Sequence, residues 1–139
     1  MPSPDGATAA DTIRVVGAVA RRRDRVFLAR RPPGGRHGGL WEFPGGKVEP
    51  GEDDRAALRR ELREELAVDS QIGALIAVGR DGRVELWCYA VDLLGEPDPL
   101  EATEVGWFSR NELRDLPIPP ADRPALERVL FALGAHGGA

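Results

Sequence analysis

One segment limits the folds and activities open to this chain more than any other. Residues 45–68 read GGKVEPGEDDRAALRRELREELAV, and leucines recur every four residues within 53–66, as on a helix with one buried face. Two glutamates four residues apart line a neighbouring face, and a third stands on the next ridge. The leucines are Leu58, Leu62 and Leu66, and the glutamates are Glu61, Glu64 and Glu65. Like charges at this spacing destabilise a helix by on the order of 0.2–0.5 kcal/mol unless a counterion is present.

This acidic ridge has two interpretations on physical grounds. Three converging carboxylates offer the oxygen ligands and the negative charge that a hard divalent cation needs. Alternatively, the segment is a solvated surface helix with ion pairs, because Arg60 and Glu64 stand four residues apart. The preceding Pro44-Gly45-Gly46 favours a turn that passes close to a ligand, where a free carbonyl adds another oxygen. The residues alone leave both interpretations open.

Composition excludes several classes of protein. The chain has 139 residues, 42% of them hydrophobic, which suffices for one domain with a core. Its formal net charge of −4 argues against binding to a nucleic-acid polymer, which needs a basic surface. One cysteine, Cys88, excludes an internal disulfide. No apolar run approaches the roughly 20 residues that span a bilayer, and no secretory signal is visible, so we expect a cytoplasmic protein. We expect it to be either a monomer or a homodimer.

The pattern of apolar residues predicts alternating strands and helices. We expect one domain over 13–133 between a disordered tail at 1–12 and a flexible tail at 134–139. A Ser109/Glu112 capping box predicts a short helix, and Asp81-Gly82 predicts a hairpin turn. The expected strands are 13–20, 25–30, 72–79, 83–94 and 105–108, with a short apolar segment at 40–43 and helices at 53–66, 109–116 and 122–133. Such an order indicates an α/β or α+β sandwich.

The spacing within residues 46–68 resembles the motif of the Nudix hydrolases, Gly-x5-Glu-x7-Arg-Glu-aliphatic-x-Glu-Glu-x-Gly-aliphatic. The chain supplies every specified residue except the last glycine, where it has Ala67. At this helix end we expect a slightly displaced loop and retained activity. Residues 40–49 (LWEFPGGKVE) and 116–124 (LPIPPADRP) also resemble the MutT branch and the related CTP pyrophosphohydrolases. The resemblance covers about residues 13–133 and implies the Nudix α/β/α sandwich, with a mixed sheet and the motif as loop–helix–loop.

The resemblance also implies a metal site and an activity. It implies Mg²⁺, with Mn²⁺ as a substitute, and hydrolysis of a normal or modified (d)NTP to NMP and pyrophosphate by attack at the β-phosphorus, in a role such as nucleotide-pool sanitation. Arg60 resembles a residue that orients the glutamates, and Glu101 resembles an additional loop glutamate, with Glu104 as the alternative. The implied metal ligands are Glu61, Glu64, Glu65, Glu52, the Gly45 carbonyl and Glu101.

The implied substrate contacts are Arg30, Arg31, Gly46, Lys47 and Asp122. Asp122 stands where a base-reading residue is found in the family, and it would favour an exocyclic amine such as that of cytosine. Guanine is the alternative, through its own amine and ring N–H. It also suits an N-cap of the last helix. Arg36 and His37, in the glycine-rich segment 31–39, receive no role. Two alternative functions stay open: hydrolysis of another nucleoside diphosphate derivative such as ADP-ribose, and a catalytically weak nucleotide-binding module.

Overall fold

The computed structural model describes residues 11–100 and 104–137, arranged as a sheet between helices. In chain order the elements are β1 (Ile13–Arg22), β2 (Arg25–Arg30), β3 (Trp41–Glu42), β4 (Gly45–Lys47), α1 (Asp54–Leu66), β5 (Ser70–Asp81), β6 (Val84–Leu93), β7 (Val105–Phe108), α2 (Arg110–Asp115), the 3-10 helix η2 (Pro120–Asp122) and α3 (Arg123–Gly137). The predicted N-terminal tail lies outside the described residues up to residue 10. Helix α3 extends to Gly137, so most of the predicted C-terminal tail is helical.

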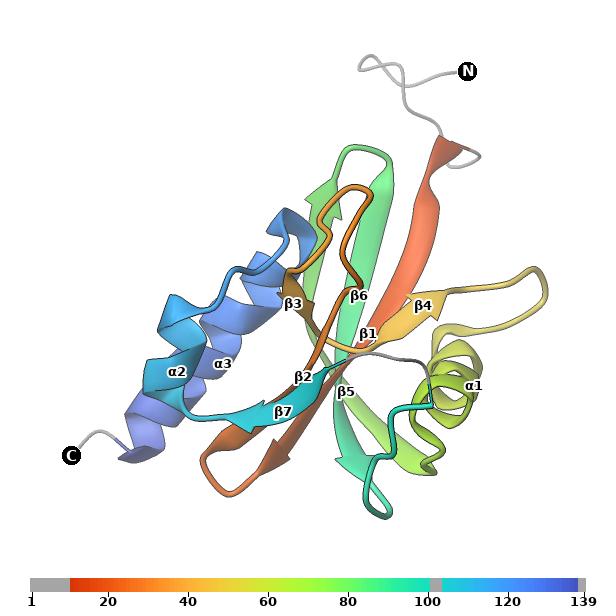
Figure 1. The fold of residues 1–139 in the computed structure, drawn as a ribbon. Helices are drawn as coiled ribbons and strands as arrows, with labels where there is room; N and C mark the ends of the chain where they lie inside the picture. The colour runs from red at the N-terminus through yellow and green to blue at the C-terminus, as the bar shows by residue number, and fades with distance from the viewer. Residues whose placement is uncertain (1–10, 101–103, 138–139) are drawn as a thin grey trace.

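The sheet is mixed, as predicted. Its main strand order is β3-β2-β1-β6-β5, with β4 paired to β1 and β7 paired to β2. Strands β1 and β6 run parallel, while the other pairs are antiparallel. Helix α1 covers one face, and α2 and α3 cover the other (Figure 1). The structure therefore confirms the predicted α/β/α sandwich.

Strand β1 explains why the core has two halves. It lies centrally in the sheet, so its residues from Val16 to Ala20 are buried on both sides. Val16, Ala18 and Ala20 pack with α1, whereas Val19 packs with α3. A strand that is covered on both faces typically has a continuous run of apolar residues in its sequence, and this segment has such a run.

Helix α1 has well-defined ends. The Asp53 side chain accepts a 2.8 Å hydrogen bond from the Ala56 N–H and so caps the first turn. At the other end Ala67 adopts the left-handed conformation (φ 50°, ψ 39°), and its N–H donates to the Arg63 carbonyl oxygen. Glycine is usual at such a position, because a Cβ strains the left-handed backbone. The helix therefore ends in ordinary geometry despite the alanine, with no displaced loop required at this residue.

Two local predictions need correction. The predicted turn at Pro44-Gly45-Gly46 is in part a strand, because Gly45 and Gly46 begin β4 and pair with Gly17 and Val16. A Cβ on Gly45 would lie 1.9 Å from the Val16 carbonyl oxygen, so glycine at this position allows strands β1 and β4 to approach closely. The hairpin turn falls one residue later than predicted, since β5 ends at Asp81 and β6 begins at Val84. The capping box of α2 is confirmed.

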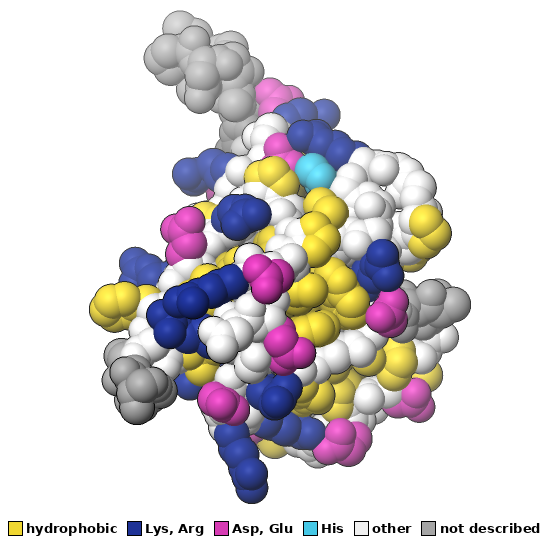
Figure 2. Space-filling view, turned by 60° about the vertical axis from the view of Figure 1, so that its left-hand side comes forward, with side chains coloured by type: hydrophobic (Ala, Val, Ile, Leu, Met, Phe, Trp, Pro, Cys, Tyr) yellow, Lys and Arg dark blue, Asp and Glu magenta, His cyan; other side chains and the backbone are white. Residues whose placement is uncertain are grey.

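One face of the molecule carries charged side chains of both signs (Figure 2). On the side that carries α2 and α3, basic and acidic side chains are intermixed around hydrophobic ones (Figure 2). Among the described residues, none of the helices combines the length and apolar character needed to cross a membrane.

Candidate active site

Helix α1 presents its acidic ridge away from the core. Leu58, Leu62 and Leu66 are almost fully buried and fix the rotation of the helix against the sheet. Because the leucines hold the neighbouring face of the helix against the sheet, the three predicted ligands emerge beside strand β4 and the segment before it. The side chain of Glu61 is 14% exposed and that of Glu64 is 59% exposed. The three glutamates therefore span a gradient from the protein interior to solvent.

Arg60 connects the acidic residues of this region. Its guanidinium donates to both carboxylate oxygens of Glu52, at 2.7 and 2.9 Å, and also contacts Glu61 at 3.1 Å and Glu64 at 3.2 Å. A further bond reaches the Lys47 carbonyl oxygen. The bond from Arg60 lowers the pKa of Glu52 to about 2, and these carboxylates raise the pKa of Arg60. The structure thus gives Arg60 the contacts of an orienting residue.

Glu65 and Glu61 form the crowded centre of the ridge. Burial, together with a hydrogen bond from the neighbouring Glu61 carboxyl group and the charge of that group, raises the pKa of Glu65 to about 8. Gly46 of β4 lies against Glu61, and a Cβ on Gly46 would stand 2.4 Å from the Glu61 carboxyl carbon. Glycine at this position therefore makes room for the carboxylate.

The carboxylates of the acidic ridge do not converge on one point in this structure. Within residues 11–100 and 104–137, no three His, Cys, Asp or Glu side chains stand close enough to hold a metal ion as they lie. The carboxylates of Glu61 and Glu64 both contact the Arg60 guanidinium, so each already has a positively charged partner. The donor set nevertheless suits a hard cation, since it consists of oxygen ligands whose mutual repulsion is already visible at Glu65.

A cavity of about 410 Å³ opens beside the glutamates. Its walls include Glu61, Glu64 and Glu65 together with Arg30 and Arg31 at the end of β2. Each arginine already has a carboxylate partner. Arg30 contacts Glu104 at 3.0 Å, and Arg31 contacts Glu42 at 3.2 Å. Both arginines predicted to contact the substrate therefore lie beside the acidic ridge.

A second cavity, of about 440 Å³, adjoins the first. The two share Arg31, Pro32 and Glu42 in their walls. The second is lined by apolar side chains from the α3 face of the sheet and by the remaining predicted substrate contacts, which are Gly46, Lys47 and Asp122. Gly45, which was predicted as a metal ligand, also lines this second cavity. An elongated ligand with one anionic end and one flat, partly apolar end would occupy both cavities.

Asp122 is the buried polar group of the second cavity. It is 4% exposed, and its Oδ2 accepts a 3.0 Å hydrogen bond from the Phe43 N–H. Burial raises the pKa of Asp122 to about 7, although the Phe43 bond opposes the shift. The hydrogen bond described for this side chain joins it to Phe43 rather than to the first turn of α3. The observed contact therefore belongs to the cavity and not to a helix cap.

Glu42 is the site residue that the sequence analysis missed. It lines both cavities, and its neighbours Trp41 and Phe43 are buried in the α3-side core. Burial raises the pKa of Glu42, while the Arg31 guanidinium opposes the shift. Strict alternation along Trp41-Glu42-Phe43 was the available signal, because it turns Glu42 away from the core that its neighbours enter.

The structure describes one of the two candidate loop glutamates, Glu104. Glu101 lies outside the described residues, so its predicted role stays a prediction. The alternative, Glu104, pairs with Arg30 through its side chain, and its carbonyl oxygen accepts the Arg30 N–H at 2.8 Å.

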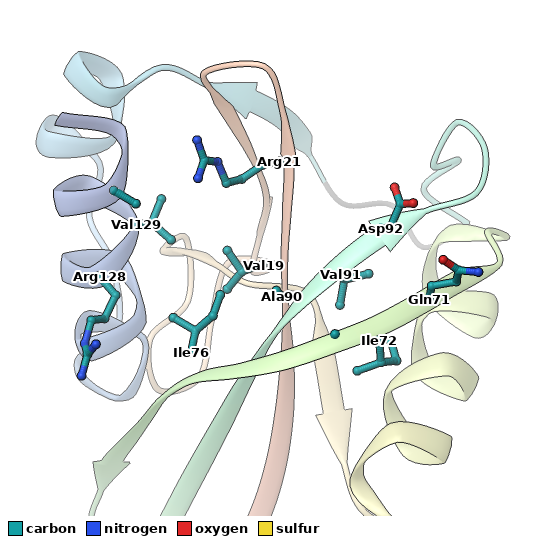
Figure 3. A pocket seen from close by; sticks show the side chains of 12 residues that line it. Val19, Arg21, Gln71, Ile72, Ile76, Ala90, Val91, Asp92, Arg128 and Val129 are labelled. Carbon is teal, nitrogen blue, oxygen red and sulfur yellow. The ribbon is translucent and has the colours of Figure 1, made fainter. Parts of the chain in front are cut away.

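A third cavity lies away from this region. It measures about 550 Å³ and lies between α3 and the sheet (Figure 3). Val19, Ile76 and Val129 form part of its apolar wall, whereas Arg128 and Asp92 stand far apart at its edges (Figure 3). It shares no lining residue with the other two, and its polar groups do not converge. This cavity is larger than either of the other two, but its polar side chains are not gathered as a catalytic or binding site requires.

This chain is similar to known proteins over most of its length. A family model described as the NUDIX domain matches residues 11–129. The CTP pyrophosphohydrolase of Escherichia coli (strain K12) is 40% identical over 130 residues, covering 89% of this chain and 96% of that protein. A putative 8-oxo-dGTP diphosphatase 2 of Mycobacterium tuberculosis (strain ATCC 25618 / H37Rv) is 42% identical over 120 residues, covering 80% of this chain and 82% of that protein.

Solved structures show the same likeness in three dimensions. The solution structure of the E. coli ORF135 protein has a TM-score of 0.73 and 36% identity, covering 96% of this chain and 99% of that one. A MutT NUDIX hydrolase from Burkholderia pseudomallei has a TM-score of 0.76 and 31% identity, covering 85% and 98%. With the family model matched over most of its length, this chain belongs to the Nudix family of hydrolases.

Proposed function

We propose that the protein is a Mg²⁺-dependent nucleoside triphosphate pyrophosphohydrolase that releases a nucleoside monophosphate and pyrophosphate. The adjoining cavities carry this proposal. One joins the glutamates of α1 to Arg30 and Arg31, as a polyphosphate and its cation need, and the other offers apolar walls with Asp122, as a nucleobase needs. Relatives named CTP pyrophosphohydrolase and 8-oxo-dGTP diphosphatase support a nucleotide substrate.

The metal ligands follow from the acidic ridge. Glu61, Glu64 and Glu65 would hold the cation, supported by Glu52 and the Gly45 carbonyl, with Glu101 added from its loop. When bound, Mg²⁺ or Mn²⁺ neutralises the charge that develops on the phosphate oxygens. Arg60, which contacts Glu52, Glu61 and Glu64, would position these carboxylates beside the cation.

The chain's own residues supply the remaining chemistry. Arg30 and Arg31 bind phosphate oxygens by exchanging their carboxylate partners for the substrate, because a guanidinium matches phosphate geometry. A glutamate of α1 accepts the proton of the attacking water, for which a carboxyl pKa raised toward neutrality is suited. Asp122 binds the base. Its ionised carboxylate accepts hydrogen bonds only, so it favours a base with an exocyclic amine, such as cytosine.

A nucleotide panel tests this proposal. We would measure steady-state hydrolysis of the eight common nucleotides, oxidised dGTP, 5-methyl-dCTP and ADP-ribose, with and without Mg²⁺, and identify the products. We expect Mg²⁺-dependent release of pyrophosphate from a triphosphate. Glu64→Gln should lower kcat by about 100-fold or more. The matched control Glu127→Gln, at an exposed position of α3, should leave it within about twofold.

The same panel separates the alternatives. Preferred cleavage of ADP-ribose would replace the triphosphate substrate by a nucleoside diphosphate derivative. Nucleotide binding without turnover at saturating Mg²⁺ would refute hydrolysis and support a binding module. Wild-type turnover by Glu64→Gln would refute the role of that residue.

A further inference from the structure

The glycine-rich segment 31–39 forms one wall of the second cavity, and its conformation depends on a distant residue. Main-chain hydrogen bonds close its base, between Arg31 and Leu40 and between Gly39 and Arg31. Nearer the tip, the side chain of His37 approaches Asp81, the last residue of β5. The His37 Nε2 and the Asp81 Oδ2 lie 2.8 Å apart, and the Arg36 guanidinium contacts the other Asp81 oxygen at 2.9 Å.

Three further observations concern how this contact holds the segment. The side chains of His37 and Asp81 are 22% and 18% exposed, although the residues from Pro32 to Arg36 are exposed. His37 also has a left-handed backbone (φ 63°), which costs free energy in any residue with a Cβ. Glycines at positive φ on both sides give the segment little stiffness of its own. The Leu40 N–H donates to the His37 carbonyl oxygen at 3.2 Å, and Asp81 adds a contact from outside the segment that holds the His37 side chain.

Both partners also face the nucleoside end of the candidate site. His37 and Asp81 line the same cavity as Asp122, whereas the cavity beside the glutamates contains neither. We propose that Asp81 latches the glycine-rich segment through His37 and Arg36, and that this latch preforms the nucleoside-binding wall. The inference rests on the proposed function only for its kinetic consequence. His37 and Asp81 are positioning residues, and they act on substrate binding rather than on the chemical step.

Trypsin gives a test that needs no substrate. Cleavage after Arg36 requires the segment to open locally, since a protease needs a mobile stretch around the bond. We expect Asp81→Ala to accelerate this cleavage about five- to tenfold, because two charge-assisted hydrogen bonds are lost. His37→Asn removes the ring while keeping a residue that tolerates the left-handed region, and it should accelerate cleavage less. The matched control Asp92→Asn, an exposed aspartate of β6, should cleave like the wild type.

A double variant and steady-state kinetics complete the test. If His37 acts through Asp81, the His37→Asn/Asp81→Ala variant should resemble Asp81→Ala alone. Asp81→Ala should raise the nucleotide KM about three- to tenfold and leave kcat within about twofold. Unchanged cleavage after Arg36, equal acceleration by Asp92→Asn, multiplicative effects in the double variant, or a loss confined to kcat would each overturn the latch. Absence of wild-type turnover would instead refute the proposed function, since the proteolysis result stands without substrate.

Discussion

The left-handed Ala67 at the end of α1 leads to a quantitative stability prediction. An L residue with a Cβ loses roughly 1–2 kcal/mol in this conformation, which glycine adopts freely. Glycine also increases the conformational entropy of the unfolded chain, which offsets roughly 0.5–1 kcal/mol of the gain. Ala67 is exposed and its N–H bond to the Arg63 carbonyl oxygen is unaffected, so no packing is lost. Ala67→Gly should therefore raise the free energy of unfolding by about 0.5–1 kcal/mol and Tm by about 2–4 °C.

The same substitution elsewhere in the helix provides the control. Ala56 lies in the first turn of α1, so Ala56→Gly carries the entropy cost without relieving strain and should lower stability by about 0.5–1 kcal/mol. Urea and thermal unfolding of both variants against the wild type measure the two signs. The reasoning is refuted if Ala67→Gly leaves stability unchanged or lowers it. We expect Ala67→Gly to keep kcat within about twofold.

Three further predictions concern the site. Arg60→Gln should lower kcat at least about tenfold in steady-state assays, while the nucleotide KM changes less than about threefold. The reason is that Arg60 orients carboxylates and does not bind substrate, so a change confined to KM would contradict this prediction. Gly46→Ala should lower kcat about tenfold or more, because the added Cβ would displace Glu61. The control Gly95→Ala should not lower kcat, since its Cβ would make only an ordinary contact at 3.8 Å, and similar kinetics for the two variants would argue against the steric role of Gly46. Asp122 has a pKa raised by burial to about 7 from an ordinary 3.8, so ionisation costs stability as pH rises through that interval. The Tm of Asp122→Asn minus that of the wild type should therefore increase between pH 5 and pH 8, and parallel curves would count against the raised pKa.

Local sequence patterns predicted most of the elements and the acidic ridge. Helix α1 was predictable because its leucine spacing, its Asp53 cap and its glutamates all lie within one short segment. Strand β4 was missed because a Gly-Gly pair is typical of turns, and only the close approach to Val16 shows why a strand needs glycine there. The parallel pairing of β1 with β6 leaves no local signal.

Contacts between distant segments account for what the sequence did not reveal about the site. Phe43 and Asp122 are 79 residues apart, and His37 and Asp81 are 44 apart, yet each pair is joined by a hydrogen bond. Glu42 becomes a site residue only when two cavities form around it. Such juxtapositions depend on topology, whereas the hydrophobic period reports only which face of an element is buried.

The central position of β1 has a consequence for synthesis on the ribosome. Strand β1 is made first, but its parallel neighbour β6 spans Val84–Leu93, so the middle of the sheet cannot close until more than half of the chain has emerged. Until then the nascent chain exposes an apolar strand with an unpaired edge, which is the kind of surface that recruits chaperones and promotes aggregation. The pairing at the centre of the sheet therefore forms only after β6 has been made, although β1 can pair with β2 and β4 earlier.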